Sequence, residues 1–168
     1  MLSAPEKLTS AHDVSPFSCG KPGLDRWLKT RALSNQEKEF AAVIVVHEDH
    51  QVVGYYGLVP TSEVPGSLPR SIRTGQPPDP VPCLLLGQLA ADEKRASRGI
   101  GTGLLKHALQ RCVVASALVG GRALIVNAID EDAAYFWDRR GFLASKDDPQ
   151  LLFRSIPDIA ASLAAARD

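Results

Sequence analysis

Residues 82–109 constrain the fold of this chain more than any other segment. Residues 83–91 form an apolar run of strand length, residues 92–97 are a charged connector, and residues 98–103 hold three glycines before leucines at helical spacing. A strand, a glycine-rich turn and a helix N-terminus make an anion-binding arrangement. The glycines let the backbone approach a ligand, and the helix end offers unpaired N–H groups with a favourable dipole. We therefore predict a phosphate site here.

The spacing of the glycines excludes two common phosphate motifs. Leu104 stands where the dinucleotide fingerprint needs a third glycine after Gly99 and Gly101, and no Gly-Lys-Ser/Thr sequence is present. A glycine-rich turn that binds no ligand stays open as an alternative at this point.

Composition limits the class of protein. A chain of 168 residues is long enough for a substantial core, and we predict one domain over residues 1–168. The formal net charge of zero argues against a general polyanion binder. No apolar run reaches transmembrane length and residues 1–10 contain no hydrophobic signal core, so a cytoplasmic location is expected. Cys19, Cys83 and Cys112 match neither a zinc pattern nor a disulfide framework, and the last two are expected in the core.

Hydrophobic periodicity predicts an alternation of strands and helices. We expect short strand structure at residues 7–9, strands over 41–47, 52–59, 83–91, 122–129 and 150–155, and helices over 23–37, 100–118, 133–140 and 158–166. Residues 60–82 contain seven of the twelve prolines and are expected to be irregular. This segment carries Arg70 and Arg73.

Two sequence motifs, placed within this predicted order of strands and helices, resemble those of the GNAT acetyltransferases. The first is the glycine turn, which is similar to the family's Arg/Gln-x-x-Gly-x-Gly/Ala. Its Arg/Gln position falls on Ala96 if Gly99 and Gly101 are the motif glycines, or on Arg98 if Gly101 and Gly103 are; the seven-residue step from Asp92 to Gly99 favours the first alignment in this family. The second motif resembles the family's Asn-x-x-Ala-x-x-Phe-Tyr-x-x-x-Gly-Phe helix and comprises Asp130, Ala133, Phe136, Trp137, Gly141 and Phe142.

A narrower resemblance extends over nearly the whole chain. Residues 17–28, 54–58, 79–82 and 86–92 are similar to the GNAT toxins of type II toxin–antitoxin modules. The resemblance implies an α/β (α+β) GNAT fold with a central mixed, mostly antiparallel sheet that is splayed at the acetyl-CoA site. It also implies acetyl-CoA-dependent acetylation of the α-amino group of aminoacyl-tRNA, which blocks translation, and a ribbon–helix–helix antitoxin as partner. No membrane contact is expected, and homodimerisation is left open.

The resemblance also assigns residues to acetyl-CoA. The backbone of Leu89, Ala90 and Ala91 would pair with the pantetheine arm and donate to the thioester oxygen, which is oxyanion stabilisation. The amides of Arg98, Gly99, Ile100, Gly101, Thr102 and Gly103 would hold the pyrophosphate, assisted by the side chains of Arg95 and Arg98. Asp130 stands where the family often has Asn, and a helix-capping role is favoured over contact with CoA. No metal is expected.

The proton donor for the departing thiolate is the main departure from the family. The family's usual tyrosine is replaced by Trp137, whose indole donates an N–H but is not a usable acid at neutral pH. Tyr135 lies about 200° away around the helix and cannot simply replace it. Tyr56, or its neighbour Tyr55, is the alternative from the adjacent strand, and water is another. His107 is expected to be exposed rather than catalytic.

The sequence contains no convincing buried general base, and this predicts which kind of amine accepts the acetyl group. An α-amino group titrates near pH 8 and is partly neutral at pH 7, whereas a lysine near 10.4 needs a stronger base, so the sequence favours an α-amine. Arg70 and Arg73 are the predicted tRNA contacts. Two alternatives stay open: an enzyme acting on a small-molecule amine or a protein N-terminus, and a non-catalytic module that binds acetyl-CoA or an antitoxin.

Overall fold

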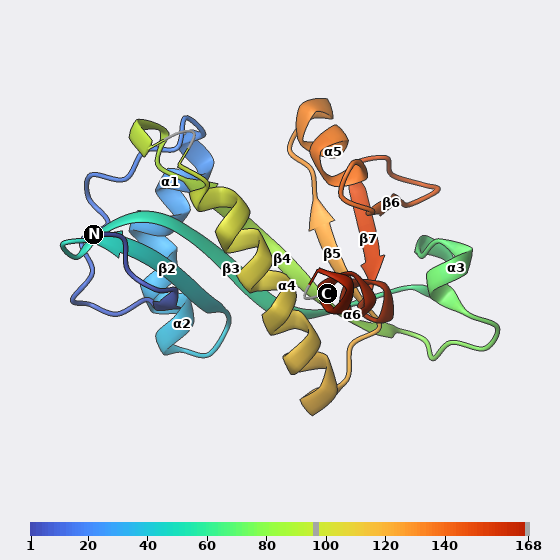
Figure 1. The fold of residues 1–168 in the computed structure, drawn as a ribbon. Helices are drawn as coiled ribbons and strands as arrows, with labels where there is room; N and C mark the ends of the chain where they lie inside the picture. The colour runs from blue at the N-terminus through green and yellow to red at the C-terminus, as the bar shows by residue number, and fades with distance from the viewer. Residues whose placement is uncertain (96–97, 167–168) are drawn as a thin grey trace. The chain divides into compact units, whose positions relative to one another are not determined.

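A computed structural model describes residues 1–95 and 98–166 (Figure 1). The strands are β1 (Glu6–Lys7), β2 (Ala42–Glu48), β3 (Gln51–Glu63), β4 (Val81–Ala91), β5 (Ala123–Asn127), β6 (Leu143–Ala144) and β7 (Leu151–Ser155). They are hydrogen-bonded in the order β1-β2-β3-β4-β5-β7-β6. The pairing of β4 with β5 is parallel, whereas β1–β2, β2–β3, β5–β7 and β6–β7 are antiparallel. The predicted mixed, mostly antiparallel sheet is thus confirmed.

The helices follow the predicted order. They are α1 (Pro22–Trp27), a π-helical turn (Leu28–Ala32), α2 (Leu33–Glu37), a 3₁₀ turn (Pro65–Ser67), α3 (Arg70–Arg73), a second 3₁₀ turn (Glu93–Arg95), α4 (Ile100–Val119), α5 (Glu131–Asp138) and α6 (Ile156–Ala165). The chain packs as two compact units, Met1–Val59 with Leu86–Ala108, and Pro60–Leu85 with Leu109–Asp168. Each is described by itself below. The prediction of a single domain stays a prediction.

The first unit is built on the β2–β3 hairpin. Asp49 and His50 form its turn with left-handed φ angles of 48° and 67°. Helices α1 and α2 lie beside these strands in Figure 1, and Phe17, Leu28 and Tyr55 belong to the core cluster between them. The Tyr55 hydroxyl donates to the carbonyl oxygen of Leu24 at 2.6 Å, so this buried polar group is satisfied.

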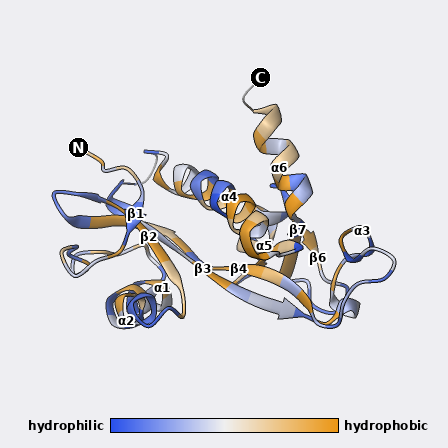
Figure 2. Ribbon diagram, turned by 90° about the horizontal axis from the view of Figure 1, so that it is seen from below, coloured by the Kyte–Doolittle hydropathy of each residue, from blue (hydrophilic) through white to orange (hydrophobic). Residues whose placement is uncertain are grey.

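The second unit packs α3 against the start of β4 and the strands β5 and β7. Leu68 and Ile72 are buried with Val81, Ile125 and Phe153 in one cluster. Arg122 Nε donates to the carbonyl oxygen of Ile72 at 2.7 Å, which holds α3 in place. Figure 2 shows hydrophobic residues along β4 and β7.

The proline-rich segment is more regular than predicted. Strand β3 continues through Pro60 to Glu63, and α3 and a 3₁₀ turn follow before β4 begins at Val81. Proline lacks an N–H but its φ suits extended backbone, so one proline does not end the strand. Leu68 and Ile72 then pin the segment to the core. The two-residue strand β6 was not predicted because so short a run carries no periodic signal.

Other predictions of local structure are confirmed. Cys83 and Cys112 are buried, and burial raises the pKa of their thiols to about 11 and about 12, respectively. The recorded β4–β5 pairing involves Leu84 and Leu85 of the second unit. The predicted splay beyond these residues stays a prediction. No helix in the described part of the chain is both long and apolar enough to span a membrane.

Gly54 of β3 is tightly packed in the first unit. A Cβ there would lie 2.7 Å from Ile100 Cγ2 and 2.7 Å from Leu104 Cδ1. We expect Gly54→Ala to lower the free energy of unfolding by about 1–3 kcal/mol through overpacking. Gly23→Ala is the control, since a Cβ at Gly23 would meet no heavy atom of another described segment within 4 Å. Urea denaturation of both variants checks this; an equal stability of Gly54→Ala and wild type would contradict it.

Candidate functional site

The glycine turn has the backbone geometry predicted from the sequence. Gly99 has a φ of +75°, in the left-handed region that favours glycine, and helix α4 begins at the next residue, Ile100. The N–H of Gly103 donates to the carbonyl oxygen of Gly99 at 3.0 Å, which closes the first helical turn. The turn therefore presents a helix N-terminus, where a negative charge is stabilised.

The space around this turn fits an anionic ligand. Among the described residues, a Cβ added at Gly99, Gly101 or Gly103 would meet no heavy atom within 4 Å apart from its chain neighbours and its own helix, so the backbone is open to an approaching group. The Arg98 side chain is 53 % exposed at the same turn. Three small residues, a helix N-terminus and an accessible guanidinium match the requirements of a phosphate. Ala96, the other candidate for the Arg/Gln position, lies outside the described residues.

Arg95 and Arg98 share one carboxylate. Glu48, the last residue of β2, contacts Arg95 Nε through Oε2 at 3.3 Å and Arg98 through Oε1 at 3.0 Å. Partial burial opposes ionisation of Glu48, but the hydrogen bond from Arg95 and the charges of Arg98 and Arg95 outweigh it and lower its pKa. The sequence did not predict Glu48 as part of this site.

The strand that leads into the turn ends on a buried carboxylate. Leu89, Ala90 and Ala91 are the last residues of β4, and Asp92 directly after them is 3 % exposed. Asp92 Oδ1 accepts from the N–H of Lys94 at 2.9 Å, and its own N–H donates to the carbonyl oxygen of Val53 at 2.8 Å. These bonds fix the end of β4.

Tyr56 and His107 form a polar pair within the first unit. Tyr56 is fully buried, and its hydroxyl lies 2.7 Å from His107 Nδ1. The expectation that His107 is exposed is therefore wrong: it is half-buried, because its position in α4 faces β3 rather than solvent. The side-chain pattern of α4 alone does not reveal this partner.

Helix α5 carries the remaining candidates of the second unit. Trp137 is 8 % exposed and packs edge-on against Phe142 with the ring centroids 5.1 Å apart. Tyr135 is 62 % exposed, with the Arg139 guanidinium 5.5 Å from its ring centroid. Asp130 Oδ1 accepts from the N–H of Ala133 at 2.8 Å, so Asp130 has the predicted capping role.

Arg70 and Arg73 line a pocket of about 590 Å³ in the second unit. Its other lining residues are Pro65, Thr74, Gly75 and Pro77. The arginines lie three positions apart on α3, which places them on one face. Within residues 1–95 and 98–166, no carboxylate forms an ion pair with either arginine. The pocket is thus positively charged.

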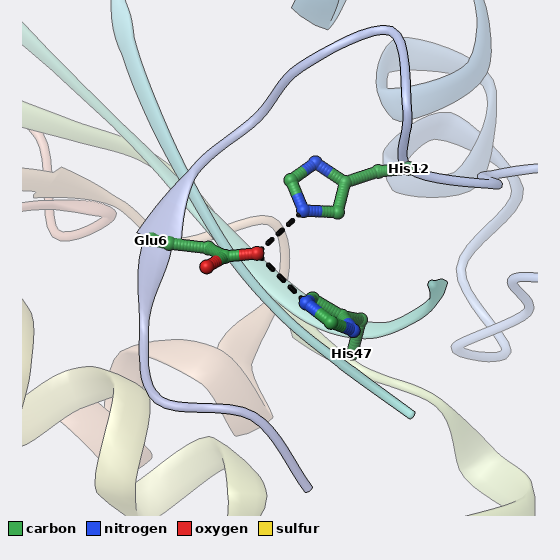
Figure 3. Close-up of side chains that lie close together, drawn as sticks. All are labelled: Glu6, His12 and His47. Carbon is green, nitrogen blue, oxygen red and sulfur yellow. Dashed lines mark hydrogen bonds and ion pairs between the residues drawn. The ribbon is translucent and has the colours of Figure 1, made fainter. Parts of the chain in front are cut away.

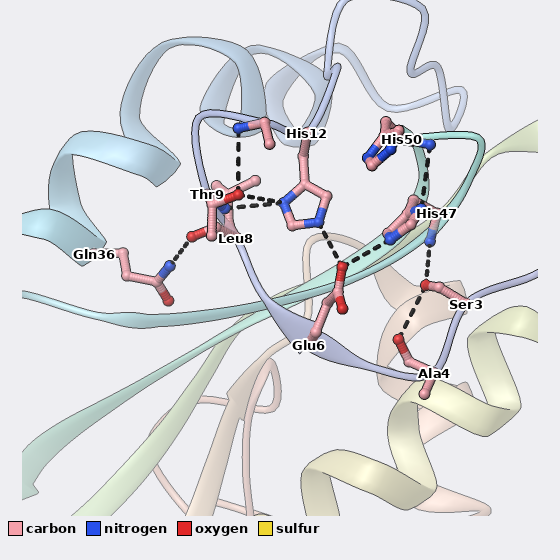
Figure 4. A network of polar contacts seen from close by, with 10 residues as sticks. Ser3, Ala4, Glu6, Leu8, Thr9, His12, Gln36, His47 and His50 are labelled. Atoms are coloured by element: carbon pink, nitrogen blue, oxygen red, sulfur yellow. Dashed lines mark hydrogen bonds and ion pairs between the residues drawn. The ribbon is translucent and has the colours of Figure 1, made fainter.

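A second polar cluster ties the N-terminal segment to β2. Glu6 Oε1 lies 2.7 Å from His12 Nε2 and 2.7 Å from His47 Nε2, and all three side chains converge (Figure 3). Figure 4 shows the surrounding contacts, in which the N–H of Thr9 donates to His12 Nδ1 at 2.9 Å and the N–H of His50 donates to His47 Nδ1 at 3.3 Å. None of these contacts was predicted from the sequence.

The ligand types of this cluster suit a metal, but its hydrogen bonds do not. The ligand atoms of Glu6, His12 and His47 lie within 4.8 Å of one another. A neutral histidine that binds metal through Nε2 carries its proton on Nδ1 and usually donates it to an acceptor. Here both Nδ1 atoms face backbone N–H donors, so the protons belong on Nε2, where they are donated to Glu6. We interpret the cluster as a structural clamp.

The family of the chain follows from comparison with known proteins. Residues 9–142 match the acetyltransferase (GNAT) family. The chain therefore belongs to the GNAT acetyltransferase family, and the predicted family and fold are confirmed.

More specific similarity is to toxins of this family. A tRNA-acetylating toxin of Mycobacterium tuberculosis (strain ATCC 25618 / H37Rv) is 39 % identical over 159 residues, which cover 95 % of each chain. The structure of AtaT complexed with acetyl-methionyl-tRNAfMet is 27 % identical, covers 97 % of this chain and 99 % of its own, and has a TM-score of 0.87. A tyrosine-to-phenylalanine variant of AtaT, bound to the C-terminus of the antitoxin AtaR and to acetyl-CoA, is 27 % identical, covers 98 % of this chain and 99 % of its own, and has a TM-score of 0.80.

The clamp at Glu6 gives a pH-dependent prediction. Hydrogen bonds from His12 and then His47 lower the pKa of Glu6 from 4.5. A lowered folded-state pKa contributes stability that is present above pH 4.5 and is lost as the pH falls through the lowered value. We expect Glu6→Gln to lower the Tm by a few degrees at pH 7, and the difference from wild type to shrink towards pH 3.

Thermal unfolding followed by circular dichroism at both pH values measures this difference. Glu37→Gln on α2, an exposed residue, is the matched control and should leave the Tm unchanged at either pH. A Glu6→Gln difference that is the same at pH 7 and pH 3 would refute the role of the ionised carboxylate.

Proposed function

We propose that this chain is an acetyl-CoA-dependent N-acetyltransferase that modifies the α-amino group of aminoacyl-tRNA and so acts as a translation-blocking toxin. The observation that carries the proposal is the open glycine turn at the N-terminus of α4, beside the exposed guanidinium of Arg98. Two independent similarities support the acceptor: the tRNA-acetylating relative, and the fold shared with AtaT complexed with acetyl-methionyl-tRNAfMet.

The residues of the turn are proposed to bind the phosphates of acetyl-CoA. The backbone N–H groups of residues 98–103 and the Arg98 side chain would hold the pyrophosphate, with Arg95 assisting. Acetyl-CoA supplies the acetyl group as a thioester. The backbone of Leu89 to Ala91 would donate to the thioester oxygen and stabilise negative charge there as the amine attacks.

The proposed proton donor for the departing thiolate is Tyr56, Tyr135 or a water molecule. The indole of Trp137 has no acidic proton to give at neutral pH, and its ring packs against Phe142. Tyr56 has a phenol that is already hydrogen-bonded to His107, and Tyr135 has an exposed one. Replacing the acting tyrosine by phenylalanine would reduce kcat by about 10²–10⁴-fold.

The acceptor and protein partner are proposed from charge and from the relatives. Arg70 and Arg73 supply two positive charges at one pocket, which suits the phosphate backbone of tRNA. The antitoxin AtaR is bound to AtaT in a solved structure, and we propose a ribbon–helix–helix antitoxin as the partner of this chain. A cytoplasmic location is part of the same proposal.

Transfer of labelled acetyl from acetyl-CoA to total charged tRNA tests the proposed function directly. Label should appear on charged tRNA and not on deacylated tRNA, because the proposed acceptor is the amino group of the attached amino acid. Gly99→Glu should reduce acetyl-CoA binding at least tenfold in calorimetry, since it adds bulk and negative charge to the turn.

Two controls separate the possible causes. Gly23→Glu adds the same charge on the exposed start of α1 and should bind acetyl-CoA as wild type does. If the wild-type chain binds acetyl-CoA but labels a small amine or a protein N-terminus instead of charged tRNA, the proposed acceptor is wrong and that amine is the acceptor. A chain that binds acetyl-CoA and labels nothing would be a binding module.

The pocket on α3 gives a separate prediction for tRNA. Replacing both Arg70 and Arg73 by alanine should weaken tRNA binding by about tenfold or more and lower the slope of log K against log salt by about 1–2, while acetyl-CoA affinity stays unchanged. Filter binding over a range of salt concentrations measures this. The control replaces the exposed Lys38 and Lys146 by alanine, which removes the same amount of positive charge at other positions of the chain. Equal losses in both double variants would contradict a local contact.

A further inference from the structure

Glu48 contacts two arginines, Arg95 and Arg98, which come just before Gly99 in the sequence. Its carboxylate lies at the end of β2, 18 % exposed, and each oxygen contacts a different guanidinium. Arg95 is 22 % exposed, and its Nε donates to Oε2 at 3.3 Å. The other oxygen, Oε1, is then directed at Arg98, which is 53 % exposed.

Arg98 retains donors for a second partner. A guanidinium offers five N–H donors in a planar fork, and the recorded contact with Glu48 uses one terminal nitrogen at 3.0 Å. A long arginine side chain loses much rotamer freedom when it is fixed on a ligand. A carboxylate that already fixes one end of the fork removes part of this cost before a phosphate arrives.

We propose that Glu48 is a positioning residue, which holds the Arg98 guanidinium at the glycine turn so that its free N–H groups bind a phosphate of acetyl-CoA. This inference rests on the proposed function, and it adds a residue outside the glycine motif to the binding site. Glu48 does not contact the ligand itself. It acts through Arg98, and Arg95 holds Glu48 in place.

If Glu48 had the opposite role, competing with the ligand for Arg98, the Kd for acetyl-CoA would change in the opposite direction. If Glu48 instead competed with the phosphate for Arg98, removing the carboxylate would free the guanidinium and tighten acetyl-CoA binding. Positioning predicts weaker binding. The sign of the change in Kd therefore separates the two.

The test is a thermodynamic cycle on acetyl-CoA affinity, measured by calorimetry on the full chain. We expect Glu48→Ala and Arg98→Ala each to raise the Kd by about tenfold, and the double variant to be no weaker than Arg98→Ala alone. Glu48→Gln keeps one side-chain oxygen that can contact a guanidinium, and should restore part of the lost affinity. Circular dichroism and the Tm check that each variant is folded.

Asp49→Asn is the matched control. Asp49 is exposed and directly follows Glu48, as the first residue of the hairpin turn, and asparagine tolerates its left-handed φ of 48°. It removes the same charge without removing the contact to Arg98, and should leave the Kd within twofold of wild type.

Three results would overturn the inference. They are an unchanged or lower Kd for Glu48→Ala, a loss of affinity that persists in the Arg98→Ala background, and an equal loss in Asp49→Asn. A wild-type chain that does not bind acetyl-CoA would overturn the proposed function instead, so the two failures are distinguishable.

Discussion

The candidate site depends on a buried carboxylate at the end of β4. Asp92 is withdrawn from water, and an ionised carboxylate in such a position is costly unless hydrogen bonds satisfy it. The N–H of Lys94 donates to Asp92 Oδ1 at 2.9 Å and the N–H of Ser18 donates to Oδ2 at 3.4 Å, while the N–H of Glu93 donates to the carbonyl oxygen of Ser18 at 2.9 Å. The connector is thereby fixed at its start. The end of β4, which leads into the glycine turn, is thus tied to Val53 and Ser18 of the first unit.

How much of the site could be read from the sequence depends on how local each interaction is. Gly99 and the start of α4 were predictable because a positive φ and a helix N-terminus have signals within a few residues. The capping role of Asp130 was predictable for the same reason, since its acceptor and donor are three residues apart. Strand and helix order followed from periodicity, but the short β6, the length of β3 and helix α3 were missed.

Interactions between distant segments were not predictable in this way. Glu48 and Arg95 are 47 positions apart in the chain, and Glu6 and His47 are 41 apart. Each depends on which residues a strand register brings together, and a shift of one residue would turn these side chains to the other face. The same limit explains His107, whose neighbour on β3 converts an apparently exposed position into a half-buried one. Conversely, the sequence located Trp137 at the tyrosine position, but its packing against Phe142 emerges only from the fold.

The basic residues of the two candidate binding regions are held differently, and this has a physical consequence. Arg95 and Arg98 are paired with a carboxylate that is itself largely buried, so their geometry is fixed and their field is partly neutralised. Arg70 and Arg73 are paired with no carboxylate of the described residues and face an open pocket. The first arrangement suits one small ligand whose phosphates must meet fixed donors. The second suits a long polyanion, for which unneutralised charge supplies affinity through counterion release. Binding of acetyl-CoA should accordingly depend more on the positions of these fixed donors than on salt concentration. Binding of tRNA should depend more on salt concentration than on the exact positions of the arginines.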